Sequence, residues 1–175
     1  MQITINPYDK KSIDKAINQL TEYKNRMAVK EAEMVRRIAQ LGLNVASVKF
    51  SQALYAGTND VTCRVEQNGI SATIFAEGEA VGFIEFGTGV RHPEHPGFAD
   101  YEPPEHGTYG KGKGANPGWW DYYGDPGNKG HLITTRNGRK KVRTSGNEPA
   151  RAMYDAIISM VEQIAQIARE VWSSD

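Results

Sequence analysis

The sequence has a single cysteine, no long hydrophobic run and no net charge, and each of these absences excludes a class of protein. Cys63 alone forms neither an intrachain disulfide nor a multi-cysteine zinc site. No apolar run is long enough to cross a bilayer, and Met1 to Lys10 lacks the charged-then-apolar pattern of a signal peptide. We therefore expect no membrane partner and a protein that stays in a reducing cytoplasm.

The charge balance argues against a general nucleic-acid binder. The 175 residues carry 21 basic and 21 acidic side chains, whereas DNA-binding proteins are usually basic overall. Hydrophobic residues make up 39% of the chain, which is enough for a core without disulfide support. The sequence predicts a single domain over residues 1–175.

A long helix is predicted for residues 11–41. Good helix formers fill this stretch, and its apolar residues follow one another by steps of three, four or seven, which places them in one stripe. Ser12 is the predicted N-cap and Gly42 the predicted stop. Such a helix would be about 46 Å long, so we expect it to bend or to overhang the rest of the domain. The stripe comprises Ile13, Ile17, Leu20, Met27, Met34, Ile38 and Leu41, interrupted by Lys24 and Glu31.

An antiparallel β-meander is predicted for residues 45–86. Val61 to Glu66 alternate between apolar and polar side chains, which is the period of a half-buried strand. Asn68-Gly69 then gives the strongest short hairpin signal, and a third strand is expected over residues 81–86. For residues 45–55 the sequence leaves a fourth strand and a short helix open.

Residues 87–146 are interpreted as an extended loop or arm. They hold most of the glycines, six of the eight prolines and all four histidines. A stretch of this length without regular structure usually means function or disorder, and its tryptophans and tyrosines argue against disorder. Within it, residues 131–144 form a predicted hairpin around Asn137-Gly138.

The chain ends in a second predicted helix over residues 148–173. Asn147 is its predicted cap, and Pro149 fits its first turn, where a missing N–H has no cost. Together these elements predict an α+β fold. In this fold a long N-terminal helix and a C-terminal helix pack on one face of an antiparallel meander, and a long Gly/Pro-rich loop contains a hairpin.

Histidines in the loop raise the possibility of a metal site. His92, Glu94, His95 and His106 are of ligand type, but Pro93 prevents the helical spacing that a His pair needs. Exposed loop histidines are the simpler interpretation. A metal-dependent enzyme that uses these residues is therefore kept only as an alternative.

Two further motifs also fall short of an active site. Residues 107–114 approach a phosphate-binding P-loop, but Gly114 replaces the Ser or Thr that holds magnesium, and no apolar strand leads into the motif. Cys63 lies on the apolar face of a strand, where a cysteine usually packs rather than reacts. We predict no catalytic residue, no metal and no cofactor.

The hairpin is more informative, because the stretch from residue 129 to 143 contains basic side chains and no acidic one. Contact with phosphate or with an acidic protein surface would use such a cluster. Lysines that protect a solvated hairpin from edge pairing would look the same. A DNA-binding module is thus a further alternative. The basic residues are Lys129, Arg136, Arg139, Lys140, Lys141 and Arg143.

Four segments resemble the signature of a bacteriophage family, the small tail-component proteins of long-tailed phages, also called neck or tail-completion proteins. The segment from Phe83 to Gly89 is similar to its (Y/F)-(I/V)-E-(F/Y)-G-T-G motif. Residues 50–61 resemble the segment before its first strand pair, and residues 118–123 its Gly-Trp-aromatic motif. Residues 144–156 resemble its T-x-G-x-x-P-x-x-x-(M/L)-Y-x-A opening of the last helix. The resemblance spans roughly residues 10–173, and the loop is longer here.

The resemblance implies a structural virion protein without enzymatic activity. Such proteins resemble tail terminators and act where the DNA-filled head joins the tail. We expect this chain to bind copies of itself in a ring, which we take to be hexameric, and to contact the tail tube or its terminator and the head connector or head-closure protein. Non-specific contact with transiting DNA is also expected. The location would be the virion, after assembly in the host cytoplasm. A tail-tube terminator is the alternative position.

Interface residues are predicted from the same motifs, because aromatic side chains anchor interfaces best. The basic hairpin is expected to face the lumen or an adjoining ring. Glu85 lies within an apolar segment and needs a partner, for which Arg91 and Arg151 are the candidates. The predicted interface set is Phe83, Glu85, Phe86, Trp119, Trp120, Tyr122 and Tyr123.

Overall fold

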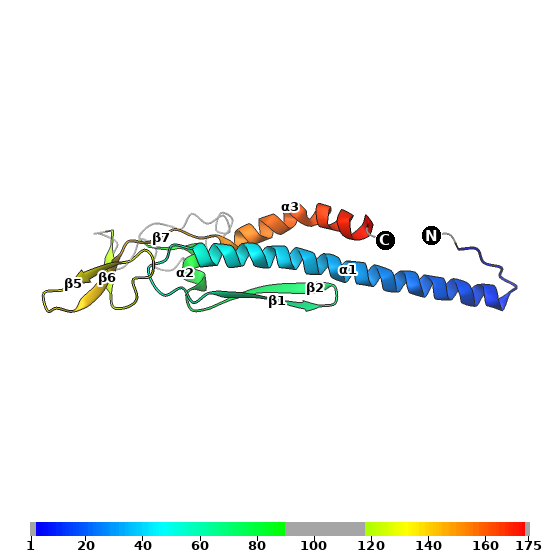
Figure 1. The fold of residues 1–175 in the computed structure, drawn as a ribbon, viewed down its shortest axis with the longest axis horizontal. Helices are drawn as coiled ribbons and strands as arrows, with labels where there is room; N and C mark the ends of the chain where they lie inside the picture. Colours follow the sequence, from blue (N-terminus) through cyan, green and yellow to red (C-terminus); the bar gives the residue numbers. More distant parts are fainter. Residues whose placement is uncertain (1–2, 90–117, 174–175) are drawn as a thin grey trace, which may run out of the picture.

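The computed structural model describes residues 3–89 and 118–173, and its architecture is α+β, as the sequence predicts. The molecule is elongated around one long helix, α1 (Lys10–Gln52). A β-hairpin of β1 (Thr62–Asn68) and β2 (Ser71–Glu77) lies along one side of α1, and α3 (Ala152–Ser173) lies along the other (Figure 1). The helix α1 is therefore the middle layer, between the hairpin and α3. The helix α3 covers α1 rather than the hairpin.

Short elements complete the fold. They are α2 (Val81–Phe86), β3 (Thr88–Gly89), β4 (Trp120–Tyr122), β5 (His131–Thr134), β6 (Lys140–Thr144) and β7 (Gly146–Asn147). The strands β3 and β7 pair as a small antiparallel ladder that joins the ends of the long loop. The strands β4, β5 and β6 form a three-stranded antiparallel sheet at one end of the molecule (Figure 1).

The first helix is longer than predicted at both ends. Asp9 rather than Ser12 caps it, because the Asp9 carboxylate accepts the Lys11 N–H at 3.0 Å. Gly42 does not stop it. A Cβ at this position would lie 2.5 Å from the Met160 sulfur and 2.6 Å from the Ile74 Cδ1, so this glycine lets α3 and β2 approach α1 closely. The segment whose structure the sequence left open is the last part of this helix, as far as Gln52.

The first predicted hairpin is confirmed, with its turn shifted by one residue. Asn68 pairs with Ser71, so the two turn residues are Gly69 and Ile70, and Gly69 has a φ of +59°. Glycine at the first of two turn positions matches a hairpin turn that follows the twist of the strands.

The predicted third strand is wrong, because residues 81–86 form the helix α2. Gly78, with a φ of +144°, turns the chain after β2, and Asp60 then holds the two residues that precede the new helix. The Asp60 carboxylate accepts the N–H groups of Glu79 and Ala80 at 2.6 and 2.9 Å, and these bonds hold the pKa of Asp60 below its ordinary value. Asp60 lies 19 residues before Glu79 in the chain, so no local sequence signal indicates this interaction.

The helix α3, which the sequence predicts from residue 148, begins at Ala152, four residues later than predicted. Asn147 is not its cap, because this residue belongs to β7, which pairs with β3. Its side chain accepts a hydrogen bond from the Thr88 hydroxyl at 2.5 Å and donates to the Phe83 carbonyl at 3.0 Å. The backbone N–H of Arg151, a residue with a φ of +55°, donates to the Glu85 carbonyl at 3.2 Å.

Glu85 supplies the missing cap of α3 across the fold. Its carboxylate accepts the N–H groups of Met153 and Tyr154 at 2.9 and 3.1 Å. These are among the four N–H groups that the first turn of a helix leaves without an internal acceptor. The side chain is 5% exposed, and the negative charge suits the positive end of the helix dipole. The predicted partner Arg91 lies outside the described residues.

The hydrophobic core lies where α1, α2 and α3 meet. Phe50 and Ile84 are fully buried, and alanines surround them, so that three helices approach one another closely. The buried alanines are Ala46, Ala53, Ala80, Ala152 and Ala156.

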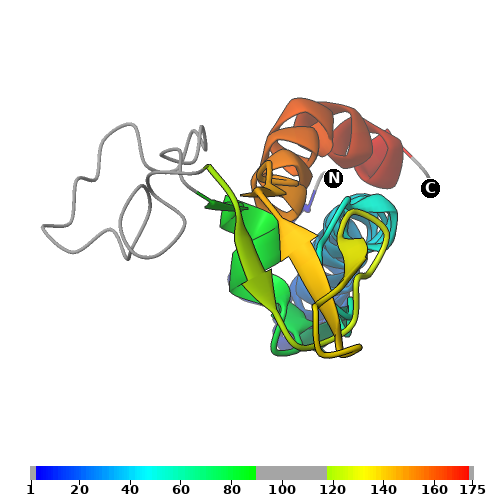
Figure 2. The ribbon, with the colours of Figure 1, turned by 90° about the vertical axis from the view of Figure 1, so that its left-hand side faces the viewer.

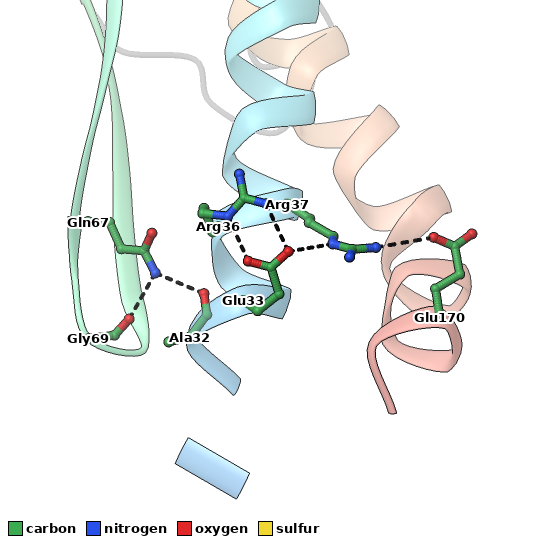
Figure 3. Close-up of polar contacts among 7 residues, drawn as sticks. All are labelled: Ala32, Glu33, Arg36, Arg37, Gln67, Gly69 and Glu170. Atoms are coloured by element: carbon green, nitrogen blue, oxygen red, sulfur yellow. Dashed lines mark hydrogen bonds and ion pairs between the residues drawn. The ribbon is translucent and has the colours of Figure 1, made fainter. Parts of the chain in front are cut away.

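Away from this core, polar contacts align the hairpin and α3 with α1 (Figure 3). The Gln67 amide donates to the Ala32 carbonyl at 2.9 Å, which holds the hairpin tip to α1. Arg37 bridges Glu33 at 2.7 Å and Glu170 of α3 at 3.6 Å. Hydrogen bonds from Arg36 and Arg37 lower the pKa of Glu33 to about 2. The predicted overhang is confirmed, because α1 continues well beyond these contacts (Figure 1).

Candidate functional site

The candidate site is the sheet at one end of the molecule, in the strand order β4-β6-β5 (Figure 2). The predicted hairpin is confirmed, since β5 and β6 pair from His131 with Arg143 to Thr134 with Lys140. The sequence did not predict that β4 pairs with β6 on the other side, with Trp120 opposite Thr144. This pairing brings the aromatic cluster and the basic hairpin, two separate predictions, onto one sheet.

One face of this sheet is polar and basic; we call it the basic face. Residues opposite each other in an antiparallel pair share a face, so Asp121, Arg143 and His131 lie side by side. The Arg143 guanidinium binds the Asp121 carboxylate through two hydrogen bonds of 2.8 and 3.0 Å. Ile133 and Lys141 form the next row of this face.

Two cations of the basic face lie over aromatic rings. The Arg143 guanidinium carbon is 3.5 Å from the centre of the Trp119 ring, and the Lys141 amine is 5.0 Å from the centre of the Tyr123 ring. Both aromatic side chains are exposed. The bond from Arg143 holds the pKa of Asp121 below its ordinary value and raises that of the guanidinium. Arg143 is therefore partly neutralised within the chain, and Asp121 is the residue of this site that the sequence analysis missed.

The other two aromatics of the cluster face the opposite way. Trp120 and Tyr122 alternate with Asp121 along β4 and are half-buried, on the same face as the buried Val142 and Thr144. The Tyr122 hydroxyl donates to the Asp125 carbonyl at 2.6 Å, and burial raises the pKa of Tyr122. The predicted aromatic set thus divides between a surface pair and a packing pair.

The hairpin loop carries exposed positive charge. The loop of residues 135–139 closes through the Thr135 N–H, which donates to the Arg139 carbonyl at 2.9 Å. Arg136, Arg139 and Lys140 are exposed, and none of the three forms an ion pair with a residue that the structure describes. Residues 118–144 contain six basic and two acidic side chains in a chain with no net charge.

A seam of hydrogen bonds, made by backbone and side-chain groups, attaches this sheet to the rest of the molecule. The Tyr55 N–H donates to the Asn128 side-chain oxygen at 2.7 Å, and the Asn128 N–H donates to the Tyr55 carbonyl at 3.2 Å. The Asn128 amide also donates to the Ala53 carbonyl at 3.0 Å. The Thr58 hydroxyl donates to the Asp125 carboxylate at 3.0 Å, and bonds from Gly127 and Thr58 lower the pKa of Asp125.

The other predicted interface residues have different surroundings. Phe83 and Phe86 are exposed on α2, whereas Glu85 is buried and caps α3. Glu85 therefore has a role within the chain, and we remove it from the predicted interface set. Lys129 lies half-buried before β5.

The enzyme alternatives find no site among the described residues. His92, Glu94, His95, His106 and the glycine-rich residues 107–114 lie outside residues 3–89 and 118–173. Within those two ranges, no three His, Cys, Asp or Glu side chains are grouped as metal ligands would be. Burial raises the pKa of the half-buried Cys63 thiol, which disfavours the reactive thiolate.

Comparison with models of protein families, with curated proteins and with solved structures found no match to this chain. Within the described ranges, no helix combines the length and the apolar content that a membrane span requires.

Proposed function

We propose that this chain is a structural subunit of the neck of a long-tailed bacteriophage, where a ring of copies joins the DNA-filled head to the tail. In this proposal the chain is not an enzyme, takes no cofactor and is located in the virion. Its partners are further copies of itself, the tail tube or its terminator, and the head connector or head-closure protein. DNA passes through the ring.

One observation carries the proposal: the four segments that resemble the phage family converge on one core. Phe50, Ile84 and Ala152, from three of these segments, pack together. The fourth segment joins through β4, where Trp120 pairs with Thr144. Segments dispersed over more than 100 residues thus build one junction. The resemblance lies in residues that determine the fold, which is the pattern expected of a shared structural part.

The use of these residues also favours a structural part over an enzyme. Glu85, Asn147 and Thr88 use their polar groups in hydrogen bonds within the chain. What remains for function is surface, which includes the exposed Trp119 and Tyr123 and the exposed basic residues of the hairpin loop. These lie on the sheet at one end of the molecule (Figure 2). Aromatic and arginine side chains dominate the binding energy of protein interfaces.

A stop codon in this gene, within the phage that carries it, tests the proposal. Electron microscopy of the lysate is expected to show separate DNA-filled heads and finished tails, and supply of the intact gene from a plasmid is expected to restore joined particles. Overlong tail tubes would instead assign the chain to the tail-terminator position. Intact, infectious particles without the protein would refute both positions.

Contact with transiting DNA predicts a weak, salt-dependent affinity carried by the hairpin loop. Combined replacement of Arg136, Arg139 and Lys140 by alanine is expected to lower the slope of log affinity against log salt by about 2.7, because each lost phosphate contact removes about 0.9. Fluorescence anisotropy with a duplex of mixed sequence measures this slope.

A control variant removes cations that are already neutralised. Arg36 and Arg37 both bind Glu33, so their replacement by alanine is expected to leave the slope nearly unchanged. An equal loss of slope per removed cation in the two variants would show that only net charge matters, and would argue against contact through the loop.

A further inference from the structure

The N-terminal part of α1, residues 10–29, projects beyond the hairpin and α3; we call it the overhang (Figure 1). The hairpin tip contacts α1 at Ala32 (Figure 3). The Lys30 amine donates to the Trp172 carbonyl near the end of α3 at 3.4 Å. The twenty residues before these contacts extend about 30 Å. Most stability of a helix in a protein comes from packing of its apolar face, and Ala16 is the one buried residue of the overhang.

An exposed apolar stripe follows the overhang. Ile13, Ile17 and Leu20 are 37%, 54% and 53% exposed, and they succeed one another by steps of four and three residues. The same alternation continues through Lys24 to Met27. Alternating steps of four and three form the seam along which one helix packs against another in a coiled coil. The spacing therefore indicates a helix as the partner of the overhang.

A second exposed stripe of the same spacing lies on α3. Ile157, Val161 and Ile164 are 51%, 64% and 47% exposed and follow one another by steps of four and three. Met160 of the same helix faces Gly42 of α1, so α3 packs one side on its own chain and leaves this second stripe outside. It offers the overhang a helical surface of matching period.

The overhang carries an excess of positive charge, and α3 does not. A pairing of two overhangs would therefore bring like charges together, whereas an overhang beside α3 would not, which favours the second arrangement. The overhang has five basic residues, Lys10, Lys11, Lys15, Lys24 and Arg26, against Asp14 and Glu22. The helix α3 has three acidic residues, of which Asp155 and Glu170 already bind Lys49 and Arg37 of the same chain, and Glu162 is exposed.

We propose that the overhang of one copy packs along the exposed stripe of α3 of a second copy. One chain does not make this contact with itself, because its overhang begins where its own α3 ends (Figure 1). The contact joins two different surfaces, so it repeats from copy to copy and closes into a ring where the rotation allows. Its role as a ring contact rests on the proposed function, but purified protein tests the contact itself without the phage.

Complementary variants test this contact. An overhang variant carries Ile17→Asp and Leu20→Asp, and an α3 variant carries Val161→Asp and Ile164→Asp; all four side chains are exposed, so circular dichroism and thermal unfolding should show intact folds. Light scattering coupled to size exclusion is expected to find assemblies for the unchanged chain. Each variant alone is expected to be monomeric, with an affinity roughly a hundredfold weaker. An equal mixture is expected to form pairs, because each pair then retains one intact contact.

The control is Val29→Asp. Val29 is 69% exposed on the same overhang, but its nine-residue separation from Leu20 places it on the opposite side of the helix, so this change should leave assembly intact. A monomeric unchanged chain, a monomeric mixture, or dissociation by Val29→Asp would each overturn the contact. Self-association of the α3 variant would overturn it in favour of paired overhangs. None of these outcomes bears on the stop-codon result, so the two proposals fail separately.

Discussion

Replacement of Gly127 by alanine is expected to lower the free energy of unfolding by about 3 kcal/mol. A Cβ at residue 127 would lie well within 3.0 Å of the carbonyl oxygens of Tyr55 and Gly57, and the φ of +57° is itself unfavourable for alanine. Because these oxygens belong to the backbone, relief requires that two chain segments move apart. That movement breaks the hydrogen bonds between Tyr55 and Asn128, which attach the basic sheet to the body.

Urea unfolding measures the loss, and a second glycine separates the clash from the effect of φ. Gly138 has a φ of +74°, and nothing lies within 4 Å of the position that a Cβ would take there, so Gly138→Ala should cost only about 1 kcal/mol. An equal loss of unfolding free energy for the two substitutions would show that the backbone around Gly127 accommodates a Cβ at little cost. Hydrogen exchange of residues 118–144 should also increase in Gly127→Ala, because the sheet loses its attachment.

Replacement of Glu85 by glutamine is expected to cost about 2 kcal/mol, although the two side chains have almost the same shape. The carboxylate accepts two N–H groups of α3, from Met153 and Tyr154, with two oxygens. Glutamine has one oxygen and places an NH₂ group against the other N–H, and it also removes the charge that the helix dipole favours. At roughly 2–4 °C per kcal/mol, calorimetry should show a fall in melting temperature of about 4–8 °C.

The matched control for Glu85 is Glu148, which lies exposed in the segment that leads into the same helix. Glu148→Gln removes the same charge without a buried hydrogen bond, so its melting temperature should stay within about a degree of the unchanged chain. If both variants have the melting temperature of the unchanged chain, the stability of α3 does not depend on the Glu85 cap.

This cap explains why the resemblance to the phage family falls where it does. Glu85 connects the Phe83–Gly89 segment to the opening of α3, and Asn147 connects the same two segments through the Phe83 carbonyl. Two motifs that are about 60 residues apart are therefore one structural unit. A protein that uses its most recognisable residues to hold its own chain together has its outer surfaces available for partners.

The sequence alone determined the local elements, because their signals are local. The apolar stripe of α1 and the Asn137-Gly138 turn both depend on residues within a few positions of one another, and both elements are present, although α1 extends beyond both of its predicted ends. The excess length of the first helix likewise predicted an overhang. The α+β class followed from these elements.

The tertiary structure decided what depends on contacts between distant residues. Gly42 looks like a helix stop, but packing of α3 and β2 against α1 uses its missing side chain. Residues 81–86 have the apolar pattern of a strand, yet they form a helix, and Asp60 binds the N–H groups of the two residues before it. The pairing of β4 with β6 gave Arg143 its partner Asp121 and combined two predicted clusters into one surface. A carboxylate that caps a helix or neutralises an arginine is chosen by proximity in space, and no periodicity along the chain records that choice.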